Sequence, residues 1–156
     1  MENIKPVKSV ARIINVLFVD DDPNFLDTTR RLFQRLGYIV TTAYNGSEAI
    51  DILKEYYCLF DIVITDYDMP GMNGVELAIA AREFTMNTPI VLFTGKIDLN
   101  EEIFMSRAGI VEVVRKPCRI SMLDSIIRKI IDQERTYRCS GSCTKKGYPK
   151  ILKDNK

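Results

Sequence analysis

Residues 62–74 read IVITDYDMPGMNG, and this stretch decides the fold. It opens with an uninterrupted apolar and β-branched run, which is typical of a strand buried on both faces of a sheet, and Asp66 closes the run. Three other runs end in the same way: residues 16–19 before Asp20-Asp21, 90–93 before Thr94, and 110–115 before Lys116-Pro117. Each run therefore predicts a buried strand with a polar residue at its carboxyl end.

The segments between these runs have helical periodicity, and residues 38–43 form one more strand-like run. Strands that alternate with helices indicate βα units and a parallel sheet, so the fold class is α/β. A fourth helix is predicted over about residues 100–107. The stripes of the other helices are Phe25, Thr29, Leu32 and Leu36; Ala49, Ile50 and Leu53; Leu77, Ala81 and Phe84; and Leu123, Ile126, Ile127, Ile130 and Ile131.

The polar residues at the strand ends should meet in space. The carboxyl ends of the strands form one edge of an open parallel sheet, and ligands bind at that edge. Asp20, Asp21, Asp66, Thr94 and Lys116 would thus bring carboxylates, a hydroxyl and an ammonium group together. This combination suits a divalent metal ion bound next to a phosphoryl group.

These motifs resemble those of the receiver domain of two-component response regulators. The matching residues are Val19 to Asp22, residues 66–74, Thr94-Gly95 and Lys116-Pro117, within a stretch from about Ile14 to about Ile131. The resemblance implies a doubly wound, five-stranded parallel sheet of the flavodoxin-like (βα)5 type, with strand order 2-1-3-4-5.

The acids at the first strand end are candidate metal ligands, because Mg²⁺ prefers oxygen ligands and keeps several waters when few carboxylates bind it. The resemblance implies Mg²⁺ or Mn²⁺ bound directly by Asp21, by Asp20 through water, by Asp66, and by the backbone carbonyl of Asp68. Alternatively, residues 20–22 simply cap the next helix. We favour the cap for Asp22 and the metal role for its two neighbours, since clustered aspartates repel one another without a cation.

Asp66 is the implied phosphoacceptor, since a carboxylate can accept a phosphoryl group as an acyl phosphate. Charge in the transition state spreads over the phosphoryl oxygens. The Thr94 hydroxyl and the Lys116 ammonium would bind these oxygens, although each could instead be an ordinary strand-end or surface residue. The resemblance also implies a cis bond before Pro117. The chain has no histidine, so if Asp66 receives its phosphoryl group from a histidine, a sensor histidine kinase or a phosphotransfer protein supplies it.

Val113 departs from the pattern, because receivers usually carry an aromatic residue three positions before the lysine. A valine cannot alternate between a buried and an exposed ring. The usual transmission of the signal to the face of the fourth helix, fifth strand and fifth helix is therefore in doubt. Residues 103–105, Ile-Phe-Met, cannot all face the core of a helix. They are either a contact for a homodimer or partner on that face, or plain surface hydrophobes.

The chain of 156 residues is long enough for about one domain. We expect an N-terminal extension over 1–12, the receiver domain over 13–135, and a flexible tail over 136–156. The tail has six basic residues and one acidic residue, which suits a solvated extension more than a nucleic-acid contact. Cys139 and Cys143 are too few for a zinc site. With no signal peptide, membrane span or DNA-binding domain in view, we expect a cytoplasmic protein.

The leading functional prediction is a signalling phosphoacceptor that is not an enzyme, apart from its own phosphotransfer and dephosphorylation. It would switch the binding of a partner or relay the phosphoryl group. One alternative is a degenerate receiver that binds partners without phosphorylation. Another is a phosphatase of the haloacid dehalogenase type, with Asp66 and Asp68 as nucleophile and general acid. Against it, the acid pair precedes the nucleophile, and the chain lacks a cap insertion.

Overall fold

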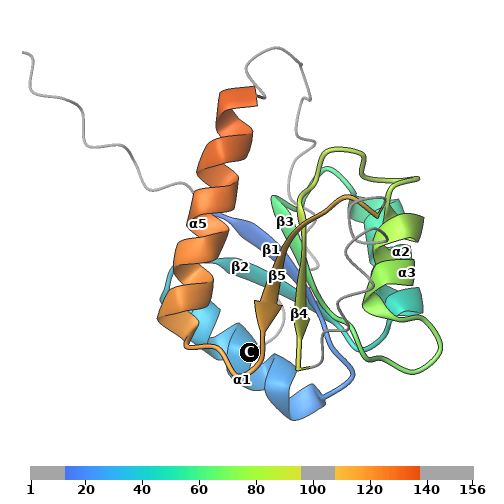
Figure 1. Ribbon diagram of the computed structural model, residues 1–156, viewed down its shortest axis with the longest axis horizontal. Coiled ribbons are helices and arrows are strands. Elements are labelled where there is room, and N and C mark those ends of the chain that lie inside the picture. Colours follow the sequence, from blue (N-terminus) through green and yellow to red (C-terminus); the bar gives the residue numbers. More distant parts are fainter. Residues whose placement is uncertain (1–12, 96–107, 138–156) are drawn as a thin grey trace, which may run out of the picture.

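The structure is a computed structural model, and it describes residues 13–95 and 108–137. One parallel sheet holds five strands in the order β2-β1-β3-β4-β5 (Figure 1), so the predicted fold class and strand order are confirmed. The strands are β1 (Asn15–Val19), β2 (Ile39–Ala43), β3 (Ile62–Asp66), β4 (Ile90–Thr94) and β5 (Ile110–Arg115). The described helices are α1 (Pro23–Arg35), α2 (Gly46–Tyr56), α3 (Gly74–Ala81) and α5 (Ile120–Tyr137).

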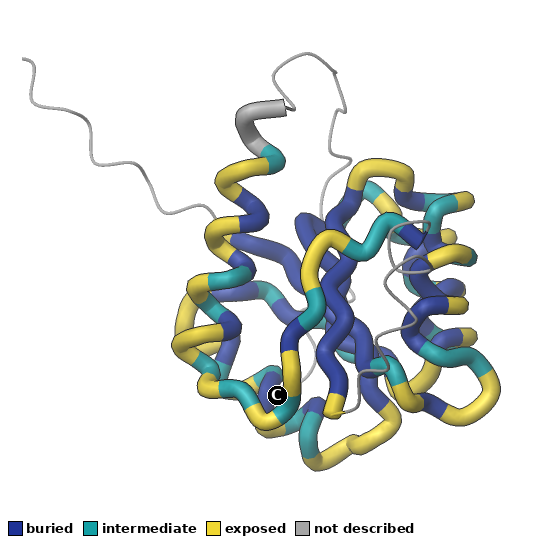
Figure 2. Tube along the Cα trace, in the orientation of Figure 1, coloured by how far each residue is buried: buried dark blue, intermediate teal, exposed yellow. Residues whose placement is uncertain are grey.

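Helices cover both faces of the sheet, and each face has its own hydrophobic core. In Figure 1, α1 and α5 lie on one side of the sheet and α2 and α3 on the other. Along β1, Val16 and Phe18 pack into the core under α1 and α5, whereas Leu17 and Val19 pack into the other core. Figure 2 shows the central strands buried along their length. This explains why they read as continuous apolar runs.

Asp22 and Pro23 begin α1 as predicted. The Asp22 carboxylate accepts hydrogen bonds from the backbone N–H groups of Asn24 and Phe25, and Pro23 occupies the first turn. The predicted stripe is confirmed only in part, since Thr29 is buried and Phe25 packs against the core, whereas Leu32 is half-buried and Leu36 is exposed. The fully buried face of the helix consists of Leu26, Thr29 and Phe33. The cap sets where the helix begins and therefore which residues face the sheet.

Helix α3 ends at Ala81, so Phe84 lies in a turn beyond the helix and the prediction that it belongs to the helical stripe is wrong. Arg82 accounts for the early end. Its guanidinium donates hydrogen bonds to the carbonyls of residues 85, 86 and 88, at 3.1, 3.4 and 2.9 Å, which bends the chain back around it. It also donates to the carbonyls of Ala108 and Gly109, and so ties the end of α3 to the start of β5.

Strand β5 pairs with β4 alone among the described residues, and Val114 is its one buried residue. The prediction of a buried strand over 110–115 is therefore wrong, because an edge strand exposes more of its side chains than a central one. Helix α5 continues to Tyr137, past the boundary predicted after residue 135. The helix predicted over 100–107, residues 103–105 and both tail cysteines lie outside the described residues. In the described part of the chain, no helix is long and apolar enough to cross a membrane.

Candidate functional site

The register of the strands brings the polar residues to one edge of the sheet. Val19 of β1 lies beside Thr65 of β3, so the next residues, Asp20 and Asp66, are also neighbours. Pairing continues across β4 and β5: Phe93 lies beside Asp66, and Thr94 beside Arg115. Thr94 and Lys116 therefore end their strands at the same edge as the two aspartates.

The carboxylates of Asp20, Asp21 and Asp66 form a cluster whose potential ligand oxygens all lie within 4.8 Å of one another. Asp20 and Asp66 are buried, whereas Asp21 is exposed. One oxygen of Asp20 accepts a hydrogen bond from the backbone N–H of Asp22 at 2.9 Å. This hydrogen bond fixes the turn between β1 and α1, so that consecutive acids take different positions around the cluster.

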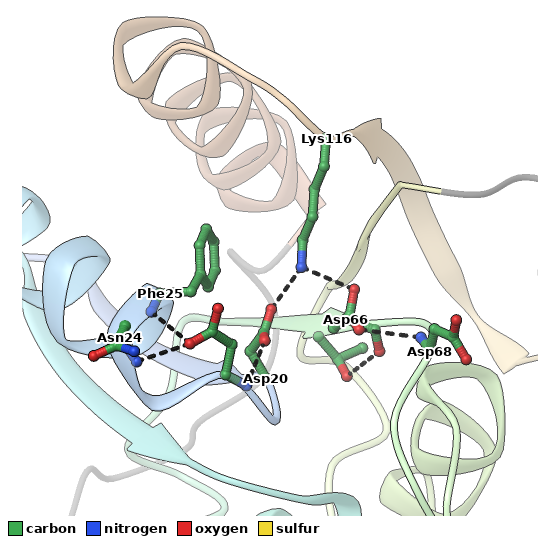
Figure 3. Close-up of polar contacts among 8 residues, drawn as sticks. Asp20, Asn24, Phe25, Asp66, Asp68 and Lys116 are labelled. Atoms are coloured by element: carbon green, nitrogen blue, oxygen red, sulfur yellow. Dashed lines mark hydrogen bonds and ion pairs between the residues drawn. The ribbon is translucent and has the colours of Figure 1, made fainter.

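Lys116 reaches across the edge of the sheet to the two buried aspartates (Figure 3). Its ammonium nitrogen lies 2.6 Å from Asp20 Oδ2 and 3.0 Å from Asp66 Oδ1. The backbone N–H of Lys116 donates to the carbonyl of Thr94 at 2.8 Å, which anchors the residue at the end of β4. The bond between Lys116 and Pro117 is cis, the isomer that the resemblance implies.

The charges of the site do not balance among its own residues. Burial lowers the pKa of Lys116, but its hydrogen bonds to Asp20 and Asp66 outweigh burial and raise that pKa above its usual value. The ammonium is therefore charged at neutral pH. Three clustered carboxylates face this single ammonium, which leaves an excess of about two negative charges. A cluster of carboxylates that offers only oxygen ligands fits a hard divalent cation such as Mg²⁺.

Both carboxylate oxygens of Asp66 have a partner. One oxygen contacts Lys116, and the other accepts a hydrogen bond from the backbone N–H of Asp68 at 3.1 Å (Figure 3). The loop then returns to the strand end, where the N–H of Gly74 donates to the carbonyl of Tyr67 at 3.0 Å. A Cβ atom at position 74 would collide with the carbonyl oxygen of Asp66 and lie 2.7 Å from Leu92 Cδ1. The loop can therefore close over Asp66 only with glycine at this position.

Two further predicted residues lie on strands next to the site. Thr94 is buried at the end of β4. Val113 is half-buried beside Leu92 and packs against the core under α2 and α3. Valine thus occupies the position at which the resemblance implies an aromatic switch residue.

The sequence reasoning missed two aromatic side chains at the site. The Lys116 ammonium lies 4.6 Å from the ring centre of Phe25 and 5.3 Å from that of Phe93. Figure 3 shows the Phe25 ring beside the lysine. A signal was present, since Phe25 falls in the first turn after the acids and Phe93 directly precedes Thr94. The helical spacing of Phe25 with Thr29, Leu32 and Leu36 indicates only its place on the helix, not its contact with the lysine.

The sequence profile of the response regulator receiver domain matches residues 16–128. The two-component response regulator ARR22 of Arabidopsis thaliana is 32% identical over 133 residues, which cover 84% of this chain and 93% of that protein. A CheY-like response regulator receiver domain protein from Methanospirillum hungatei JF-1 has a solved structure that matches with a TM-score of 0.76 at 25% identity. The match covers 81% of this chain and 99% of that one. The chain belongs to the response regulator receiver family.

Other relatives are much longer than this chain. The two-component response regulator ARR10 of Arabidopsis thaliana is 30% identical over 139 residues, which cover 85% of this chain but only 25% of that protein. The similarity to such relatives thus concerns their receiver segment. Receiver domains are signalling phosphoacceptors rather than classical enzymes, and membership of this family is consistent with such a role for the chain.

Proposed function

We propose that this protein accepts a phosphoryl group on Asp66 from a phosphohistidine of a sensor histidine kinase or a phosphotransfer protein. The observation that carries the proposal is the position of the Lys116 ammonium, which joins Asp66 to Asp20 beside the exposed Asp21. A nucleophile, a cation and spare carboxylates within one small site are what phosphoryl transfer needs. The absence of histidine from the chain agrees with a donor on a second protein.

Asp20, Asp21, Asp66 and the backbone carbonyl of Asp68 would hold Mg²⁺, with Mn²⁺ as a substitute. The first three offer carboxylate oxygens within 4.8 Å of one another. The bound cation would supply positive charge to a phosphoryl oxygen and offset the repulsion among the carboxylates.

In the proposed reaction, a carboxylate oxygen of Asp66 attacks phosphorus while the bond from phosphorus to the histidine nitrogen of the partner breaks. The electron pair of that bond stays on the imidazole, which leaves with the partner. Lys116 and the Thr94 hydroxyl would bind the phosphoryl oxygens, and Pro117 would help to fix the position of the lysine. The Asp68 N–H already holds one Asp66 oxygen at 3.1 Å, which orients the carboxylate.

Phosphorylation would then change partner binding or pass the phosphoryl group to another histidine. Because Val113 has no aromatic ring to reorient, we propose that the signal leaves the site through the movement of Thr94 and the main chain of β4 and β5. Membership of the receiver family removes the basis for the alternative of a haloacid-dehalogenase phosphatase. A degenerate receiver that works without phosphorylation is the alternative that an experiment must exclude.

The test is intact-mass analysis after incubation with acetyl phosphate and Mg²⁺. Wild type should gain one phosphoryl group, and it should gain none when Mg²⁺ is chelated or when Asp66 is replaced in Asp66→Ala. Asp27→Ala is a matched control, since Asp27 is an aspartate of α1 that pairs with Arg30 and Arg31 away from the site. An unmodified wild type that still binds Mg²⁺ would contradict the proposal and favour the degenerate receiver.

A further inference from the structure

The ammonium of Lys116 is close both to carboxylates and to aromatic rings. Its carboxylate partners are Asp20 and Asp66, at 2.6 and 3.0 Å. The rings belong to Phe25 and Phe93, whose centres are 4.6 and 5.3 Å from the nitrogen. A cation within about 6 Å of an aromatic ring centre, over its face, is attracted by the ring quadrupole.

The two rings also contact each other, with their centres 5.7 Å apart and their planes tilted by 32°. Phe93 is buried in β4, directly before Thr94. Phe25 is half-buried in the first turn of α1, where its backbone N–H donates to the Asp22 cap at 3.2 Å. The pair thus connects the start of α1 with the end of β4, and neither ring can move far without losing contact with the other.

We propose that Phe25 is a positioning residue for phosphoryl transfer, which acts by holding the Lys116 ammonium against the phosphoacceptor. Rings so close to the ammonium would limit its contact with water, so its attraction to charged oxygens would be screened less. They also restrict a long flexible side chain that would otherwise lose more conformational entropy on binding a phosphoryl oxygen. This inference rests on the proposed function, because it assigns the rings a role in that reaction.

Phe25→Leu keeps an apolar side chain and the backbone N–H but removes the ring. We expect it to slow the labelling of Asp66 by acetyl phosphate about fivefold, given the usual strength of cation–π contacts. Phe25→Tyr keeps the aromatic face and should restore the rate. Mg²⁺ binding, measured by calorimetry, should be the same in all three proteins. Phe84→Leu is the matched control, since Phe84 makes a similar contact with Lys54 at 5.6 Å on another part of the molecule.

A role through Lys116 has a second consequence. In a Lys116→Met background, Phe25→Leu should cause no further loss of rate, because the group it positions is gone. Equal losses with and without the lysine would overturn the proposal, as would wild-type labelling by Phe25→Leu. Equal losses would show that Phe25 only supports the fold. Wild-type labelling by Phe25→Leu would show that the ring has no role in the reaction.

A separate measurement does not depend on phosphorylation. The side-chain methylene protons of Lys116 should show an upfield ring-current shift in the NMR spectrum, with the assignment made from Lys116→Arg. The shift should shrink in Phe25→Leu and persist in Phe84→Leu. If wild type is never labelled at Asp66, the proposed function fails, yet this shift still tests where the ammonium lies. An unshifted Lys116 resonance would overturn the positioning role on its own.

Discussion

The ammonium of Lys116 connects buried carboxylates that come from different strands. Asp20 follows β1 and Asp66 ends β3, and both contact the same nitrogen. Removing one partner of a buried ion pair leaves the other without compensation, which costs more than the pair itself contributes. The lysine therefore contacts the proposed phosphoacceptor and also compensates the buried carboxylates of the folded protein.

We predict that Lys116→Met destabilises the protein in the absence of divalent cations by roughly 2 kcal/mol. The value is below that for a fully buried pair because 27% of the lysine side chain is exposed. Mg²⁺ should restore part of the loss, since it compensates the same carboxylates. Urea unfolding with and without Mg²⁺ measures both effects. A variant as stable as wild type in EDTA would mean that the carboxylates are compensated in another way.

At Val113 we predict that introducing the usual aromatic residue does not disturb the chemistry. Val113→Tyr should accept a phosphoryl group as wild type does, because position 113 packs toward the core under α2 and α3. Intact-mass labelling with acetyl phosphate gives the answer, and loss of labelling in this variant would refute the prediction.

The polar residues of the site could be predicted from sequence because each follows an apolar run, and neighbouring strands bring their ends together. Phe25 could not be predicted in the same way. Whether its ring reaches the strand ends depends on the rotation of α1, which begins at the Asp22 cap. A shift of one residue turns a helical side chain by about 100°, so a small error in the start of the helix changes its assignment.

Among the secondary-structure elements, the central strands were the most predictable and the ends of helices the least. Strands β1, β3 and β4 are buried on both faces, and their continuous apolar runs are distinctive. The end of α3 depends instead on Arg82, whose partners are carbonyls of a loop and of residues 108–109. Bonds from a side chain to loop carbonyls, two of them 26 and 27 positions away, leave no periodicity to detect in the sequence.

The loop between β3 and α3 gives a prediction at the scale of elements. Gly74→Ala should destabilise the protein by roughly 2 kcal/mol, because the new methyl group overlaps the Asp66 carbonyl and Leu92, and the backbone cannot yield easily. Gly95→Ala is the matched control, since a Cβ atom there has no neighbour within 4 Å. Thermal unfolding of both variants measures the difference.

If Gly74→Ala and Gly95→Ala unfold at the same temperature, the close packing of the loop on the end of β3 does not require glycine at position 74. If only Gly74→Ala is destabilised and also loses phosphoryl labelling, then the loop positions Asp66 as well as covering it. Gly74 would then be needed both for the packing of the loop and for the position of Asp66.

At the scale of the whole molecule, Tyr38 lies directly before β2 and connects α1 to α5, the last helix. Its hydroxyl donates to Asp124 of α5 at 2.5 Å, and the Arg128 guanidinium lies 5.3 Å from its ring centre. The ring also contacts Phe33 of α1, with a distance of 5.0 Å between ring centres. Because α1, β2 and α5 meet at this one side chain, its ionisation affects the stability of the whole domain.

Burial raises the pKa of Tyr38, and the hydrogen bond and charge of Asp124 raise it further. The folded state therefore keeps this proton to a higher pH than the unfolded chain does. The resulting stabilisation is complete below the ordinary tyrosine pKa of about 10 and is lost as the pH rises above it, toward the pKa in the folded state. We predict that the free energy of unfolding falls with pH in this alkaline range, in part because of Tyr38.

Tyr38→Phe should have a shallower decline in stability above pH ~10, because the variant has no phenol to ionise at this position. At neutral pH it should be less stable by about 1 kcal/mol, since Asp124 loses a hydrogen bond. Urea unfolding from neutral to alkaline pH measures both effects, with Tyr44→Phe as the control for loss of a hydroxyl from an exposed tyrosine. Parallel pH profiles for wild type and Tyr38→Phe would show that the contact with α5 does not depend on this proton, and that the alkaline loss of stability arises elsewhere in the domain.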